Sequence, residues 1–168
     1  MMDEAAKKTA LRMIPYGIYV LAARESDGTP HAATVNWVTQ TSFSPPLIAM
    51  AVKADSGAYA ALKASGKGAL SILGKGQQGV AFTFFKPVTV EGTTLSGQAV
   101  HDGESGAPIL DGAAASLDLR VVEIVEQGDH HVFIAEVTDA AVPRPIEGRP
   151  DEAVLEMKDL GEKVFYGG

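Results

Sequence analysis

The sequence of 168 residues contains no cysteine. This absence excludes disulfide bonds, thiolate catalysis and metal sites built on cysteine ligands. Positive charge is also scarce, because 14 lysines and arginines face 21 acids, and the net charge of -7 disfavours a nucleic-acid partner. The longest apolar runs, such as residues 18–23, are too short to cross a bilayer. The acidic N-terminus carries no apolar signal segment, so we expect a cytoplasmic protein without a membrane partner.

The rest of the composition is that of one folded domain spanning residues 1–168. Hydrophobic residues make up 46% of the chain, and 18 glycines indicate many turns. The predicted strands are residues 18–23, 31–41, 47–53, 69–73, 117–125, 131–137 and 153–157, and the predicted helices are residues 3–13, 57–64 and 77–85. Many strands joined by hairpins, with few helices, favour a mainly β fold: an antiparallel barrel with short helical insertions.

The most informative segment is residues 32–47, with the sequence AATVNWVTQTSFSPPL. Its polar residues do not alternate cleanly with apolar ones, as they would on a strand that serves only the core. Small hydroxyl and amide side chains stand beside one large aromatic ring. This combination suits a flat ligand with polar edges.

Two short motifs have less specific interpretations. Residues 74–79, GKGQQG, match the pattern of a dinucleotide-binding loop, but Pro87 ends the following helix too early for a parallel crossover. We therefore interpret them as a strand-to-helix turn. His130 and His131 are adjacent on a predicted strand, so they point to opposite faces and cannot easily share a metal. We expect no metal site, and one of the two histidines can face a pocket.

Lys53 and Lys86 each follow an apolar segment, and each lies near the start or end of a predicted helix. Two interpretations stay open for both. Solvated surface lysines are the usual case, which the sequence alone favours, whereas a phosphate clamp would use them as compact positive charges. Trp37, the single tryptophan, has a similar ambiguity between a core residue and a platform for a ligand ring, because its neighbours Asn36 and Thr39 are polar.

Five segments, taken in order, carry a resemblance to a known family. They are IPYGIYVL at 14–21, ATVNWVTQTSFSPPL at 33–47, ALSIL at 69–73, LDLRVVE at 117–123 and GDHHVFIAEV at 128–137. The set resembles the flavin reductase-like, FMN-binding split-barrel family. The features similar to its flavoredoxin-like branch are Asn36-Trp37, Lys53, Phe85-Lys86 and the aromatic residues at the C-terminus.

The resemblance implies an antiparallel split β-barrel with FMN held non-covalently at the interface of a homodimer. The positions that match cofactor-binding residues are Thr34, Val35, Asn36, Trp37, Lys53, Ala54, Ser56, Phe85 and Lys86. His130 matches the histidine that faces the nicotinamide in reductase members, so it is the candidate catalytic residue. Many reductases have two serines where this chain has Asn36 and Trp37, which places a bulky ring near the expected flavin.

The implied function is that of an FMN-binding oxidoreductase that transfers a hydride from NADH or NADPH to flavin. Two other functions stay open. One is an electron carrier that keeps its FMN and exchanges electrons with a redox protein partner, without nicotinamide turnover. The other is a flavin-binding module with no enzymatic activity. Consumption of NAD(P)H in the presence of added flavin would separate the first function from the other two.

Overall fold

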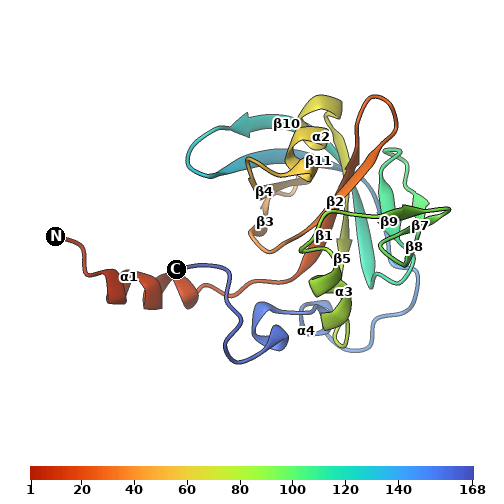
Figure 1. Ribbon diagram of the computed structural model, residues 1–168. Coiled ribbons are helices and arrows are strands. Elements are labelled where there is room, and N and C mark those ends of the chain that lie inside the picture. Colours follow the sequence, from red (N-terminus) through yellow and green to blue (C-terminus); the bar gives the residue numbers. More distant parts are fainter.

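The computed structural model describes the whole chain, from Met1 to Gly168. Its main element is a seven-stranded antiparallel sheet in the order β2-β1-β5-β10-β11-β4-β3 (Figure 1). The strands are β1 (Tyr19–Arg24), β2 (Pro30–Val35), β3 (Val38–Ser42), β4 (Leu47–Lys53), β5 (Lys67–Ile72), β10 (Ala115–Val125) and β11 (His130–Ala141). The predicted mainly β, antiparallel fold is confirmed.

The two edge strands of this sheet are neighbours along the chain, which forces the sheet to curl. β2 ends at Val35 and β3 begins at Val38, so only Asn36 and Trp37 separate the two edges. Three Cα–Cα steps span at most about 11 Å, whereas a flat sheet of this size would be roughly 29 Å wide. The sheet is therefore bent into a split barrel, and Asn36 and Trp37 lie where its edges approach each other.

The prediction of one continuous strand over residues 31–41 is wrong. β2 pairs with β1, whereas β3 pairs with β4. The chain changes partner at Asn36 and Trp37, and the Trp37 carbonyl oxygen accepts the Ala51 N–H of β4 at 2.9 Å. A pattern of apolar and polar residues describes burial, and it carries no information about which strand is the partner.

β1 is buried on both faces and separates two hydrophobic clusters. Leu21 packs in one cluster with residues of β4, β11 and α2 (Gly57–Ser65), and Phe133 is among them. Val20 packs in the other cluster with Phe84 and with residues of the C-terminal segment. Because successive side chains on a strand point to opposite faces, one strand serves both clusters.

Two short helices lie next to the strands that form the candidate site. Ser56 caps α2 by accepting the Tyr59 N–H at 3.1 Å, and Gly66 ends α2 with φ 69°, a left-handed conformation that favours glycine. Both ends of α2 agree with the prediction to within one residue. α3 (Gln78–Thr83) is shorter than the predicted helix, so Phe84 and Phe85 follow it in an irregular segment.

A second, four-stranded sheet flanks the barrel. It consists of β6 (Val90–Glu91), β7 (Thr94–Leu95), β8 (Gln98–Asp102) and β9 (Pro108–Leu110). The buried carboxylate of Asp118 in β10 accepts the Ser105 N–H at 3.0 Å and the Ser105 hydroxyl at 2.5 Å. These bonds tie the β8–β9 loop to the barrel.

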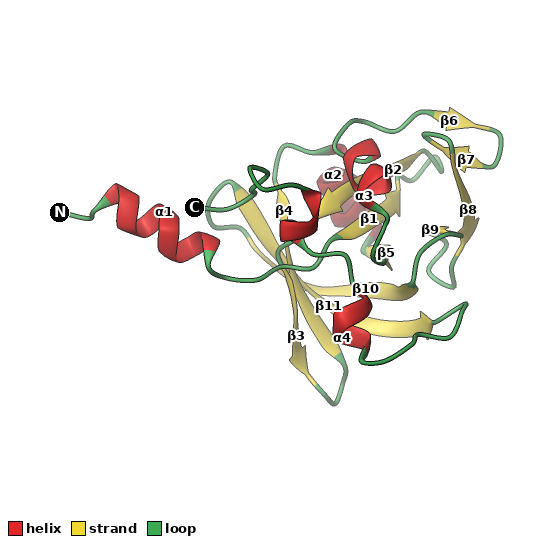
Figure 2. Cartoon of the chain, turned by 90° about the horizontal axis from the view of Figure 1, so that it is seen from below, coloured by secondary structure: helices red, strands yellow, loops and turns green.

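Both ends of the chain lie on the same side of the barrel. α1 (Glu4–Arg12) has no buried residue and projects from the body, and the C-terminus lies beside it in both views (Figures 1 and 2). The predicted strand at 153–157 is wrong, because α4 (Pro150–Ala153) and a 3-10 turn (Met157–Leu160) flank isolated bridges only. None of the helices has the length and apolar character that crossing a membrane would require.

Candidate functional site

The predicted site residues converge on a cavity of about 230 Å³, which we name the strand cavity. It is built from β2, the end of β4, the start of α2, the segment after α3, the start of β11 and the C-terminus. Its lining residues are Ile18, Ala33, Thr34, Val35, Asn36, Ala51, Val52, Lys53, Ser56, Phe84, Phe85, His130, Met157 and Tyr166. The fold thus brings together segments that are far apart in the sequence.

One part of the strand cavity carries positive charge. Lys53 ends β4, and Ser56 caps α2, whose first turn leaves backbone N–H groups without partners inside the helix. Asp55 Oδ1 lies 3.4 Å from Lys53 Nζ, but both side chains are mostly exposed, so this ion pair is weak. A lysine beside a helix N-terminus suits a phosphate group.

A wall of the strand cavity is formed by β2 and the segment after α3. The Thr34 N–H donates to the Phe84 carbonyl oxygen at 3.0 Å, and the Thr34 hydroxyl donates to the Ala81 carbonyl oxygen at 2.7 Å. These bonds fix α3 against β2, and they commit the Thr34 hydroxyl to the backbone. Phe84 is 1% exposed and Phe85 is 51% exposed, although both line the cavity. An apolar wall with an accessible aromatic ring suits a flat ligand.

His130 is the register partner of Lys53 across the β4–β11 pair, and two side chains hold its ring. Nδ1 lies 2.8 Å from Asp129 Oδ1, and Nε2 lies 2.5 Å from the Tyr166 hydroxyl. A neutral imidazole with its proton on Nδ1 satisfies both contacts, because Nδ1–H donates to the carboxylate and Nε2 accepts from the phenol. The bond to His130 lowers the pKa of Asp129, and burial raises the pKa of Tyr166. An ionised Asp129 can only accept a hydrogen bond, and a protonated Tyr166 can donate one.

Tyr166 belongs to a C-terminal tail, residues 164–168, that folds back over the strand cavity. Its ring centroid lies 5.3 Å from that of Trp37 and 5.6 Å from that of His130. Its backbone oxygen accepts a hydrogen bond from Asn36 Nδ2 at 3.1 Å. The tail therefore contacts both residues of the β2–β3 junction and the candidate catalytic histidine.

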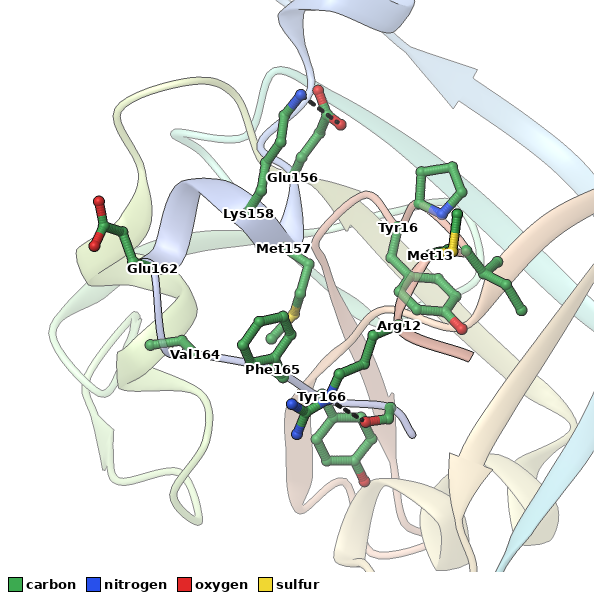
Figure 3. A pocket seen from close by; sticks show the side chains of 14 residues that line it. Arg12, Met13, Tyr16, Glu156, Met157, Lys158, Glu162, Val164, Phe165 and Tyr166 are labelled. Atoms are coloured by element: carbon green, nitrogen blue, oxygen red, sulfur yellow. Dashed lines mark hydrogen bonds and ion pairs between the residues drawn. The ribbon is translucent and has the colours of Figure 1, made fainter. Parts of the chain in front are cut away.

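Arg12 of α1 also contacts the C-terminal tail, through two of its residues. Its Nε donates to the Gly167 carbonyl oxygen at 3.3 Å, and its guanidinium carbon lies 4.1 Å from the centroid of the Phe165 ring (Figure 3). Both contacts come from a helix with no buried residue. The tail is thus anchored to an exposed element, with no regular secondary structure of its own.

Trp37 lies beside the cavity rather than on its surface. Its ring centroid is 4.6 Å from that of His130, and its indole N–H is the one buried side-chain nitrogen or oxygen without a hydrogen-bond partner. An unsatisfied buried donor costs about 1–3 kcal/mol, and such a group in a native protein calls for a specific explanation. A flavin, whose ring carries several acceptor atoms along one edge, has the right chemistry to satisfy this donor.

Comparison with known proteins identifies the family to which this chain belongs. Residues 11–157 match the family model described as "Flavin reductase like domain". The chain belongs to this flavin reductase family. One relative is the reductase component of a 4-nitrophenol 4-monooxygenase/4-nitrocatechol 2-monooxygenase from Rhodococcus opacus, with 32% identity over 139 residues, 83% of this chain and 72% of that protein. The family predicted from the sequence is confirmed.

Two further relatives of this flavin reductase differ in length. A protein from Rhizobium meliloti (strain 1021) named "Probable flavin reductase" is 29% identical over 136 residues, which are 81% of this chain but only 43% of the longer relative. The structure of an NADH:FAD oxidoreductase from Streptomyces globisporus C-1027 has a TM-score of 0.71 at 29% identity, over 84% of this chain and 86% of that one. These relatives support the predicted flavin reductase-like oxidoreductase function and the split-barrel fold.

Most of the site residues predicted for this flavin reductase line the strand cavity: Thr34, Val35, Asn36, Lys53, Ser56, Phe85 and His130. Ala54 does not line it, and its N–H donates to the Asp129 carbonyl oxygen at 3.0 Å, which fixes the turn before His130. Lys86 lies in a separate depression with Thr83 and Ser96. Lys53 and Lys86 therefore border different hollows of this chain.

Seven lining residues were not predicted from the sequence: Ile18, Ala33, Ala51, Val52, Phe84, Met157 and Tyr166. The aromatic C-terminus was visible as a pattern, but nothing local connects Tyr166 to His130, which lies 36 positions earlier. Phe84 was placed inside a predicted helix, where an aromatic residue gives no sign that it faces a ligand.

Proposed function

We propose that this flavin reductase family member transfers a hydride from NADH or NADPH to FMN held in the strand cavity. The observation that carries the proposal is one cavity that combines Lys53 at a helix N-terminus, an apolar wall, and a histidine, His130, whose Nε2 bonds to a second lining residue, Tyr166. The FMN ring accepts the hydride, whereas the protein binds and orients both ligands. The relatives named as an NADH:FAD oxidoreductase and as a monooxygenase reductase component support this function.

Each residue of the strand cavity has a distinct role in this proposal. Lys53 and the first turn of α2 would bind the FMN phosphate. Val35 and Phe85 would lie against the flavin ring. His130 would bind the nicotinamide carboxamide through Nε2. No general acid or base is required, because the hydride passes directly between the two rings.

We expect the purified protein to bind FMN more tightly than FAD. One lysine beside one helix N-terminus suits a terminal phosphate monoester, which carries more charge than the phosphate of a diester link. Flavin released by denaturation can be identified by chromatography, and the protein without flavin can then be titrated with each of the two compounds. Equal or tighter binding of FAD would contradict the assignment of this end of the cavity.

Replacing His130 with alanine is expected to raise the KM for NAD(P)H while FMN stays bound. Loss of one neutral hydrogen bond costs about 0.5–1.5 kcal/mol, so the effect should be roughly 2- to 13-fold. Steady-state NAD(P)H oxidation with added FMN measures it. His131→Ala is the matched control, because His131 bonds to the Tyr59 hydroxyl at 2.6 Å and does not line the strand cavity. A mutant that matches an active wild type would exclude His130 from nicotinamide binding.

One observation favours a second function, that of an electron carrier with bound FMN. Tyr166 already occupies the hydrogen-bonding position of His130 that a nicotinamide would need. A carrier would keep the tail in place and exchange electrons through the exposed edge of the flavin. Wild-type protein that binds FMN but oxidises neither NADH nor NADPH would establish the carrier and reject the reductase.

We also propose a homodimer and a protein partner that receives reduced flavin or its electrons. Large apolar side chains are exposed in several places, with Phe43 at 91% and Phe82 at 41%. Phe82 and Phe85 form an edge-to-face pair beside the strand cavity, with centroids 5.6 Å apart. Exposed apolar groups of this kind are typical of interaction surfaces. The Rhodococcus relative, a component of a monooxygenase, supports a partner of that class.

A further inference from the structure

A second cavity of about 300 Å³ lies against the strand cavity, between the chain after α1 and the C-terminal tail; we name it the tail cavity. The two cavities share Met157 and Tyr166, so these side chains form the partition between them. Figure 3 shows the rings of Tyr16 and Phe165 and the guanidinium group of Arg12 gathered around the tail cavity. The tail cavity has no role in the hydride transfer proposed above.

We propose that the tail cavity binds an adenosine diphosphate moiety, that of the nicotinamide dinucleotide whose other end reaches His130 in the strand cavity. This assignment rests on the proposed reductase function. Since FMN has no such moiety, NADH or NADPH is the dinucleotide that supplies it.

The sizes of the two cavities support this division. Sites for small molecules usually have volumes of about 300–1,000 Å³. The strand cavity alone, at about 230 Å³, lies below that range, so it cannot enclose a flavin ring and a whole dinucleotide. The tail cavity adds about 300 Å³ directly across one layer of side chains. A dinucleotide has two ring systems on a flexible pyrophosphate, so it can straddle such a partition.

The charges around the tail cavity also fit an anion with an aromatic base. Arg12 has no carboxylate within ion-pair distance, whereas Glu156 is paired with Lys75 at 3.3 Å and with Lys158 at 3.8 Å. Glu162 points away from the ring cluster in Figure 3. Arg12 is therefore an uncompensated cation beside aromatic rings. A guanidinium group suits a pyrophosphate, and an aromatic ring suits stacking by a base.

The partition, formed by Met157 and Tyr166, explains how binding in one cavity affects the other cavity. Tyr166 is a neighbour of Phe165, and its hydroxyl bonds to His130 Nε2. A nicotinamide amide group that bonds to His130 replaces the Tyr166 hydroxyl, and an adenine ring that stacks on Phe165 holds the same tail from the other side. Ligand groups in both cavities therefore act on the same tail, through Tyr166 on one side and Phe165 on the other.

The test compares NADH with reduced nicotinamide mononucleotide, which lacks the adenosine half. Wild type, Arg12→Ala, Phe165→Leu and the control Lys7→Ala are assayed with both donors, because Lys7 is a cation on the same helix that does not line the tail cavity. We expect wild type to prefer NADH in kcat/KM. Stacking of a base contributes about 5- to 150-fold in affinity, so Phe165→Leu should reduce this preference at least about fivefold. Arg12→Ala should reduce it as well, and Lys7→Ala should not.

A binding measurement separates failure of this inference from failure of the proposed function. ADP alone is titrated into each protein by calorimetry, and FMN and FAD affinities are compared in parallel. ADP binding that Arg12→Ala weakens supports the tail cavity even if neither donor is oxidised, in which case only the reductase function fails. An unchanged donor preference with no ADP binding overturns the inference while the reductase stands. Loss of FAD affinity alone in the variants would also overturn it, because the moiety would then belong to the flavin.

Discussion

Replacing Lys53 with alanine is expected to weaken FMN binding about 13- to 160-fold, since a hydrogen bond to a charged group contributes about 1.5–3 kcal/mol. The Lys53 side chain is 59% exposed, so solvent screening should place the effect near the lower limit. Quenching of FMN fluorescence on addition of protein measures the affinity directly. Raising the salt concentration should weaken binding to wild type more than binding to the variant, because the lost attraction is electrostatic.

Lys86→Ala is the matched control for this experiment. From the sequence, Lys86 has the same two interpretations as Lys53, but Lys86 lies in a depression that is separate from the strand cavity. We therefore expect unchanged FMN affinity in Lys86→Ala. Both lysines lie near the surface, and each substitution should change the free energy of unfolding by less than about 0.5 kcal/mol. Equal loss of affinity in both variants would show that the phosphate lies elsewhere.

Local chemistry made part of this fold predictable from the sequence. Ser56 and Gly66 determine where α2 begins and ends, since each satisfies backbone groups of a helix terminus within a few residues. The hairpin before His130 follows from Gly128, whose φ of 80° favours glycine. In both cases the determining interactions lie within a short stretch of chain.

The rest depends on contacts between distant segments, which a single sequence does not contain. The partner change at Asn36 and Trp37 follows from closure of the sheet, and no residue pattern at 31–41 encodes it. Lys53 and Lys86 are alike in sequence context, but Lys53 ends β4 and borders the strand cavity, whereas Lys86 follows α3 and borders a separate depression. Tyr166 lies in the site because the whole C-terminal segment returns past α1.

The positions of the two adjacent histidines depend both on local chemistry and on contacts between distant segments. Adjacent residues on a strand face opposite sides, so the sequence predicts that only one of His130 and His131 can face a given pocket. The structure bears this out, with His130 bonded to Tyr166 and His131 bonded to Tyr59. Which of the two faces the strand cavity follows from the register of β11 against β4, where His130 lies opposite Lys53.

Phe84 and Phe85 are adjacent, yet replacing each with alanine should change the free energy of unfolding by very different amounts. Phe84 is 1% exposed within a hydrophobic cluster, so Phe84→Ala should lower the free energy of unfolding by about 3–5 kcal/mol. Phe85 is 51% exposed, so Phe85→Ala should change the free energy of unfolding by no more than about 0.5 kcal/mol. Urea unfolding of the proteins without flavin measures both values.

Adding FMN to the same unfolding experiment separates the fold from the binding site. A ligand at 100 times its Kd stabilises the folded state by about 2.7 kcal/mol. Phe85→Ala should lose part of this gain, because the ring that borders the strand cavity from the solvent side is removed while the fold stays intact. Phe84→Ala, if it still folds, should keep more of the gain, because its ring contributes chiefly to the core. Equal destabilisation of the two flavin-free variants, with an undiminished FMN effect in Phe85→Ala, would mean that Phe85 belongs to the core and lies outside the flavin site.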